Sequence, residues 1–119
     1  MKKTVVIGAS ENPERYAYKA VVSLSKHGQE VVAVGLKDGM ILNVPITKEK
    51  KFIPDVDTVT MYVGAKNQPA WYDYILSLKP KRIIFNPGAE NNEFAQIATK
   101  NGIEVVEACT LVMLSIGNY

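Results

Sequence analysis

The chain has 119 residues, of which 47% are hydrophobic and 22% charged, so it is long enough for one compact domain over residues 1–119 and too short for two. Its formal net charge of +2 excludes a general attraction to nucleic acid or to an acidic membrane surface, and no apolar run approaches the ~20 residues of a membrane span. The single cysteine, Cys109, excludes an internal disulfide and a zinc-binding set, and it favours a reducing, cytoplasmic location.

The first elements of the chain are predicted to be a strand, a tight turn and a helix, all within residues 4–26. The β-branched run at 4–7 is typical of a buried strand. Asn12 is expected to cap a helix over 14–26, and Pro13 suits its first turn, where no backbone N–H is needed. The small residues between the strand and the helix let a ligand approach the backbone closely.

The turn after this strand is a candidate phosphate site. Gly8, Ala9, Ser10 and Asn12 lie where free backbone N–H groups and the positive end of a helix dipole converge. Arg15, at the start of the helix, is close enough in sequence to reach an anion bound there. The alternative interpretation is a structural turn that binds nothing, and the dinucleotide fingerprint Gly-x-Gly-x-x-Gly is absent.

A second β-branched run predicts a strand over 30–34, and the end of this strand bears on which nucleotide would bind. An acidic residue at this point would hold the ribose hydroxyls of NAD, but the strand runs into Gly35 and Lys37, and Asp38 comes late. Lys37 suits an extra phosphate on a ribose better than a free 2′-hydroxyl, although a solvated loop lysine is an equally good interpretation.

The middle of the chain breaks the regular pattern. Residues 35–54 contain glycines and prolines and no long helical period, so an irregular crossover is expected there, with one short helix near 47–51. A strand is then predicted over 58–63 and a helix over 68–78, with Asn67 as its cap. Regular alternation of strand and helix therefore resumes after the crossover.

The last part of the chain repeats this alternation. A strand is predicted over 82–85, a turn over 86–89 and a helix over 92–100. A strand over 103–106 follows, and the apolar tail at 109–114 is expected to pack as a short helix or as an extended segment.

Strands that alternate with helices predict an α/β fold, here a single doubly wound, mostly parallel sheet of five strands with helices on both faces. In such a sheet, ligands bind beyond the carboxyl ends of the strands, at the point where the strand order reverses. That rule brings together four loops of small residues, namely 8–12, 35–37, 63–65 and 86–89.

The loops gathered in this way carry no catalytic set. No pair of carboxylates, no Ser-His-Asp arrangement and no metal-ligand cluster falls on the predicted ligand face. A binding module therefore explains the chain better than an enzyme, while enzymatic activity is left open. The alternatives are an NAD(P)- or nucleotide-sensing regulatory domain and an enzyme subunit that a partner chain completes.

Several segments together match the pattern of a known family, namely 5–15, 26–34, 53–59, 86–91 and 98–106, with Cys109. They span nearly the whole chain, and Gly-Ala-Ser-x-Asn-Pro-x-Arg is the most specific of them. The chain thus resembles the small stand-alone CoA-binding proteins with a Rossmann-like fold, which are similar to the nucleotide-binding domain of the succinyl-CoA synthetase α subunit.

The resemblance implies non-catalytic binding of coenzyme A (CoA), or of an acyl-CoA, across the carboxyl ends of the strands. The implied contacts of the phosphates are Gly8, Ala9, Ser10 and Asn12, and that of the ribose phosphate is Lys37. The adenine side is implied to lie against Val63 and Gly64, and the pantetheine arm against Asn86, Pro87 and Gly88. With Arg15 and Gly35 from the loops above, these residues make up the predicted site. The ligase chemistry of the synthetase is not implied, and a homodimer and a partner enzyme subunit are both compatible with the resemblance.

Overall fold

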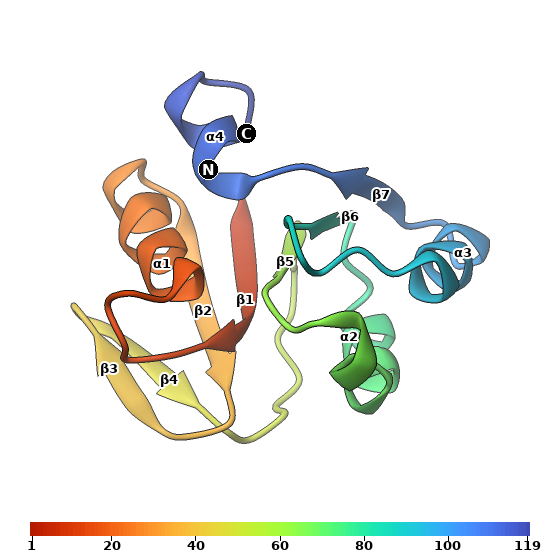
Figure 1. The fold of residues 1–119 in the computed structure, drawn as a ribbon, viewed down its shortest axis with the longest axis horizontal. Coiled ribbons are helices and arrows are strands. Elements are labelled where there is room, and N and C mark those ends of the chain that lie inside the picture. The colour runs from red at the N-terminus through yellow and green to blue at the C-terminus, as the bar shows by residue number, and fades with distance from the viewer.

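One sheet of seven strands lies at the centre of the computed structural model, which describes residues 1–119 (Figure 1). Its strands are β1 (Lys3–Ala9), β2 (Glu30–Gly35), β3 (Gly39–Ile41), β4 (Val44–Thr47), β5 (Thr58–Met61), β6 (Arg82–Phe85) and β7 (Glu104–Glu107). Their order across the sheet is β3-β4-β2-β1-β5-β6-β7, and all neighbours are parallel except β3 and β4. The helices are α1 (Tyr16–Lys26), α2 (Tyr72–Leu78), α3 (Asn92–Lys100) and α4 (Thr110–Ser115), with two 3₁₀ turns, Ala65–Asn67 and Pro69–Trp71.

The five strands predicted from β-branched runs are confirmed as β1, β2, β5, β6 and β7, in a sheet that is mostly parallel. The predicted number of five strands is wrong, because the crossover after β2 contains a further hairpin, β3 and β4, joined by Leu42 and Asn43. The short helix predicted over 47–51 is also wrong, since Thr47 ends β4 and residues 48–51 form no helix.

The hairpin is held in place by its inward side chains. Ile41 and Ile46 are buried in a hydrophobic cluster that includes Val21 and Leu24 of α1. Burial of a side chain of this kind contributes about 1.5–3 kcal/mol. This gain outweighs the poor strand preference of a segment that has Pro45 in its second strand.

Helices cover both faces of the sheet, as a doubly wound fold requires. Alternate residues of β1 point to opposite faces, so that Val5 and Ile7 pack with α2 and α3 while Val6 packs with α1 and α4. Figure 1 shows α1 and α4 on one side of β1 and α2 and α3 on the other. None of the helices has the length and the apolar character needed to cross a membrane.

The first two helical regions begin differently from the prediction. α1 starts at Tyr16, two residues later than expected. The predicted helix over 68–78 is divided into the 3₁₀ turn Pro69–Trp71 and the shorter α2, and Asn67 ends the preceding 3₁₀ turn, Ala65–Asn67, instead of capping a helix. The reason lies in Gln68, whose buried side chain makes long-range hydrogen bonds.

The last two helices agree better with the sequence pattern. α3 is confirmed at its predicted residues, and the side chain of Asn91 caps it by accepting the N–H of Phe94 at 3.1 Å. The apolar tail forms α4, with Cys109 at its N-cap position. The tail therefore adopts the helical form of the two that were predicted.

Candidate ligand-binding site

The carboxyl ends of β2, β1, β5 and β6 lie next to one another along one edge of the sheet, because these four strands are adjacent and parallel. The chain passes from β1 to β2 on one side and later reaches β5 on the other side, so the strand order reverses at β1. The four predicted loops therefore meet at the switch point, where open α/β sheets bind ligands.

Gly8 lies where the loop after β1 meets the loop after β5. Its φ of +96° is in the left-handed region, and a Cβ there would lie 3.1 Å from backbone atoms of Tyr62 and from Cγ2 of Val63. Glycine is therefore required both by the backbone conformation and by this close approach. The structure thus brings two predicted site residues, Gly8 and Val63, next to each other.

Gly35 ends β2 against the end of β1. A Cβ on this buried glycine would lie 2.2 Å from the carbonyl oxygen of Ala9. The register of the two strands shifts nearby, between Ile7 and Ala9. The role of Gly35 in the structure is therefore to let the two strand ends pack closely, and its contact with a ligand stays a prediction.

Hydrogen bonds inside the loop after β1 give it a fixed turn. The Ser10 hydroxyl accepts the N–H of Asn12 at 3.1 Å. Asn12 in turn accepts the N–H of Glu14 with its Oδ1 at 3.0 Å and the N–H of Arg15 with its carbonyl oxygen at 3.0 Å. The prediction that Asn12 caps the helix is wrong, because α1 begins later and Arg15 occupies the N-cap position.

The N-terminus of α1 is open towards this loop. No side chain caps it, and its first turn contains no acidic residue, so the free N–H groups and the helix dipole favour an anion. Arg15 and Lys37 are exposed and unpaired, since the ion pairs of the protein involve Lys3, Lys51 and Lys81. Glu11, Glu14 and Asp38 lie in the same segments, so the free N–H groups of α1, and not the net charge of these loops, favour a negatively charged ligand.

Asn86 is buried beneath the loop after β6, and its side-chain amide is engaged within the protein. It donates to Oγ1 of Thr60 at 2.7 Å and to the carbonyl oxygen of Met61 at 2.9 Å. Its Oδ1 accepts the N–H of Thr110 at 2.9 Å. Asn86 therefore ties β5 and β6 to the start of α4.

Pro87 and Gly88 form the exposed tip of the same loop. The carbonyl oxygen of Asn86 accepts the N–H of Ala89 at 2.8 Å, and Gly88 has a φ of +90°. Proline followed by a glycine with positive φ is the signature of a type II turn. The tip, more than the Asn86 side chain, is therefore available to a ligand.

Gln68 joins two loops of the site and was not among the predicted residues. Its fully buried side chain donates to the carbonyl oxygens of Val63 at 2.8 Å and Ala89 at 2.7 Å. Its Oε1 accepts a hydrogen bond from Asn91 at 2.9 Å. Gln68 therefore fixes the loop after β5 to the loop after β6, and a polar residue before a proline gives no sign of this in the sequence.

Tyr62 follows β5 and directs its hydroxyl into the interior, where it has no hydrogen-bond partner. Burial raises the pKa of Tyr62, and the neighbouring Cys109 raises it further. The hydroxyls of Thr60 and Thr110, which lie close by, bond to each other at 2.8 Å. Tyr62 therefore keeps its proton at neutral pH, beside a cysteine that is partly buried.

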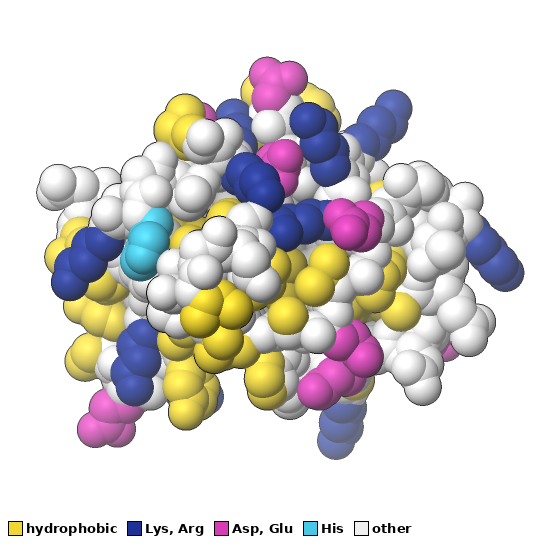
Figure 2. All heavy atoms as spheres, turned by 90° about the horizontal axis from the view of Figure 1, so that it is seen from above, with side chains coloured by type: hydrophobic (Ala, Val, Ile, Leu, Met, Phe, Trp, Pro, Cys, Tyr) yellow, Lys and Arg dark blue, Asp and Glu magenta, His cyan; other side chains and the backbone are white.

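One surface hollow, of about 860 Å³, lies at the amino ends of the strands, opposite the predicted site. Lysine and acidic side chains line it together, among them Lys3, Asp57 and Lys81. Figure 2 looks onto the end of the molecule that carries His27, in cyan, and shows basic and acidic side chains intermingled there. This mixture gives no field of one sign that would select a charged ligand.

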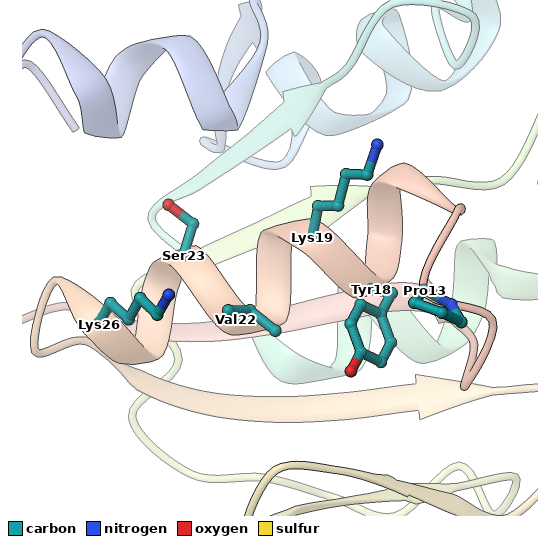
Figure 3. A pocket seen from close by; sticks show the side chains of 6 residues that line it. All are labelled: Pro13, Tyr18, Lys19, Val22, Ser23 and Lys26. Carbon is teal, nitrogen blue, oxygen red and sulfur yellow. The ribbon is translucent and has the colours of Figure 1, made fainter.

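A second hollow, of about 270 Å³, lies on the outer face of α1 (Figure 3). Its lining side chains come from Pro13 and α1 alone. Figure 3 shows Lys19 and Ser23 extending to one side of the helix while Tyr18 lies on another. These side chains do not converge on one point, as the polar groups of a binding site do.

A family model described as a CoA binding domain matches residues 2–115. The chain belongs to this family of CoA-binding domains. The family inferred from the sequence segments is thereby confirmed, together with the α/β, Rossmann-like fold. No curated protein sequence matches the chain.

Solved structures show the same fold in proteins of different size. A crystal structure described as that of an uncharacterized protein is 53% identical with a TM-score of 0.98, and the match covers 100% of this chain and 98% of that chain. A hypothetical protein from Pyrococcus horikoshii OT3 is 26% identical with a TM-score of 0.87, over 97% of this chain and 82% of that chain. An acetyl-coenzyme A synthetase from Ca. Korarchaeum cryptofilum, in complex with phosphate and ADP, is 16% identical with a TM-score of 0.73, over 90% of this chain and 25% of that chain. This last similarity shows the fold alone, as one part of a larger chain.

Proposed function

We propose that this protein binds coenzyme A, or an acyl-CoA, without catalysing a reaction on it, at the carboxyl ends of β1, β2, β5 and β6. The observation that carries the proposal is the open N-terminus of α1 at the end of β1, in a chain of the CoA-binding domain family. CoA suits this edge of the sheet because it combines a pyrophosphate, a ribose phosphate and a long neutral arm.

The pyrophosphate is proposed to lie against the loop at residues 8–12. An exposed helix N-terminus stabilises a negative charge by about 0.3–1 kcal/mol. Ser10 adds a donor, because its oxygen accepts the N–H of Asn12 and its hydroxyl hydrogen is left for a phosphate oxygen. Arg15, exposed at the start of α1, adds an unpaired positive charge.

Lys37 is proposed to bind the phosphate on the ribose of CoA. It is exposed, and the chain leaves β2 at Gly35 and continues through Leu36 to Lys37 without an acidic residue. The carboxylate that holds the ribose hydroxyls of NAD is therefore missing from its usual position. This absence makes an NAD-binding regulator the weaker alternative, although NADP shares a ribose phosphate with CoA and belongs in the test.

The loops after β5 and β6 are proposed to flank the neutral parts of the ligand. Val63 and Gly64 would line the adenine side, and Pro87 and Gly88 the pantetheine arm. Gln68 supports this arrangement, because its hydrogen bonds hold the spacing of the two loops without contribution from a ligand.

A second candidate function is that of an enzyme subunit completed by a partner chain. The Korarchaeum acetyl-coenzyme A synthetase favours it, because the region similar to this protein is only 25% of that chain. Under either function we propose a reducing, cytoplasmic setting, since Cys109 is free. A second chain that copurifies at fixed stoichiometry would favour the subunit.

Isothermal titration calorimetry of the purified protein with CoA, and with NAD, NADP and ADP for comparison, tests the proposal. We expect CoA to bind with a micromolar dissociation constant and NAD to bind clearly more weakly. Ser10→Trp is expected to abolish CoA binding by filling the loop, whereas Gln96→Trp, on the exposed face of α3, serves as the matched control. Absence of heat with CoA, or unchanged binding in Ser10→Trp, would contradict the proposal.

A further inference from the structure

Glu11, in the loop after β1, reaches across to the hairpin at the edge of the sheet. Its carboxylate accepts the backbone N–H of Met40 in β3 at 2.9 Å. The same side chain lies directly on Gly39, where a Cβ would be 2.5 Å from Cδ of Glu11. The loop at residues 8–12, which is the candidate phosphate loop, is thus joined to β3 by one charge-assisted hydrogen bond. The Glu11 side chain that makes this bond packs against Gly39, which has no side chain of its own.

The N–H of Met40 is available because of the position of β3. This strand is at the edge of the sheet, and Met40 and Pro45 form the non-hydrogen-bonded pair next to Ile41 and Val44, so the N–H of Met40 points away from β4. An outward N–H on an edge strand is otherwise left to water or to another chain. Glu11 occupies it, so the loop and the hairpin are joined at a point that the sheet itself leaves open.

This contact also fixes the segment that carries Lys37. The segment leaves β2 at Gly35, which is packed against the carbonyl oxygen of Ala9, and it enters β3 beside the Glu11 contact. At its far end, Oδ1 of Asp38 accepts the N–H of Lys48 at 2.9 Å. The position of Lys37 relative to the phosphate loop is therefore set on one side by the strand ends and on the other side by Glu11.

We propose that Glu11 is a positioning residue that sets the spacing between the phosphate loop and Lys37, and that it thereby sets the preference of the site for a ligand with a ribose phosphate. This role rests on the proposed function. The negative charge of Glu11 would by itself repel phosphates, so its contribution comes from the hydrogen bond to Met40 and not from attraction to the ligand.

The test is the ratio of the affinities for CoA and dephospho-CoA, which differ by the ribose phosphate alone. Glu11→Ala is expected to weaken CoA binding about tenfold, because restoring the spacing on binding would cost about as much as the lost hydrogen bond to a charged group supplied, and to weaken dephospho-CoA binding less than about twofold. Glu11→Gln keeps an oxygen that can accept the N–H of Met40, so it is expected to restore the wild-type ratio. Faster amide hydrogen exchange at Met40 in Glu11→Ala reports loss of the contact without any ligand.

Glu14→Ala is the matched control, because it removes the same charge from the same loop and the Glu14 carboxylate makes no contact in the structure. We expect it to leave the ratio unchanged. A wild-type ratio in Glu11→Ala, or an equal fall in Glu14→Ala, would overturn the positioning role while leaving CoA binding intact. Failure of the wild-type protein to bind either ligand would instead overturn the proposed function, and the positioning role with it.

Discussion

Substitution of Gly35 by alanine places a methyl group where β1 and β2 end together. The new Cβ would lie 2.2 Å from the carbonyl oxygen of Ala9 and 3.3 Å from Cγ2 of Ile46. Cβ atoms essentially never approach another atom within 3.0 Å, so the two strand ends must separate by roughly 0.8 Å, the difference between 3.0 Å and the 2.2 Å contact with Ala9. The closer contact joins the new Cβ to a backbone oxygen, and neither atom can move by rotation of a side chain, so the overlap can be relieved only by movement of the backbone.

The expected loss of stability follows from two opposing terms. Overpacking of this kind costs about 1–3 kcal/mol, and the upper part of that range applies because backbone must move. The reduced freedom of the unfolded chain returns about 0.4–1 kcal/mol. The free energy of unfolding of Gly35→Ala is therefore expected to fall by about 2 kcal/mol.

Urea unfolding monitored by the fluorescence of Trp71, which is the single tryptophan and is 5% exposed, measures this change. Gly64→Ala is the matched control, because Gly64 lies in a loop at the same edge, has a φ of −62° and has nothing within 4 Å of a Cβ. We expect that control to match or slightly exceed the wild-type stability. A Gly35→Ala protein as stable as the control would refute the close approach of the two strand ends.

Three further predictions concern the site. Gln68→Ala leaves the buried carbonyl oxygens of Val63 and Ala89 without their donor and is expected to lower the free energy of unfolding by about 2–4 kcal/mol in urea. Tyr62→Phe removes an unpartnered hydroxyl, so at neutral pH its stability should match or exceed that of the wild type. Above a pH of 10.0, Tyr62 of the unfolded chain loses its proton while the buried hydroxyl of the folded protein keeps it. The free energy of unfolding of the wild type should therefore fall with pH more steeply than that of Tyr62→Phe, by up to about 1.4 kcal/mol per pH unit. Equal slopes for the two proteins would contradict the burial of the Tyr62 hydroxyl. Lys37→Ala should weaken CoA in calorimetry and leave dephospho-CoA unchanged, and an equal loss for both ligands would exclude a contact with the ribose phosphate.

The elements that sequence reasoning located well are those with local signals. Strand β1 follows from the run Val5 to Ile7, and buried parallel strands read as continuous β-branched runs. Asn91 caps the start of helix α3, and Gly102, with its positive φ, follows its end, so residues next to the helix determine both of its boundaries. Neither element depends on a partner that is distant in sequence for its boundaries.

The hairpin of β3 and β4 was not predictable in this way. Its two-residue turn, Leu42 and Asn43, lacks the glycine that usually marks such a connection, and Leu42 adopts a φ of 53°. Pro45 also argues against a strand, but its missing N–H costs little, because it lies in a non-hydrogen-bonded pair with Met40 and the pairing of β4 with β2 begins only at Ile46. The start of α2 was misplaced for a related reason, since Gln68 is held by residues more than twenty positions away.

The candidate site was predicted by position more accurately than by role. The loops after the four strands do share one edge, yet the small and polar residues in them are explained first by packing. Gly35 admits the carbonyl group of Ala9, and Asn86 satisfies three hydrogen bonds within the protein. A glycine or a buried amide at a strand end is thus required by neighbouring strands before any ligand is considered, and a single sequence cannot separate the two causes.

The polar groups at this edge therefore fall into two classes with different consequences for binding. Gln68 and Asn86 already have partners, so a ligand that bonded to them would have to break hydrogen bonds that cost about as much as they return. Arg15, Lys37 and the first N–H groups of α1 have none and lose only contact with water. Apart from the carboxylate of Glu14, these unpartnered groups are positive or carry positive partial charge, so the free energy that a ligand can gain from them comes chiefly from its anionic groups. A nucleotide with several phosphates fits that condition, and in the proposed arrangement its neutral arm then contributes mainly by packing against the tip at Pro87.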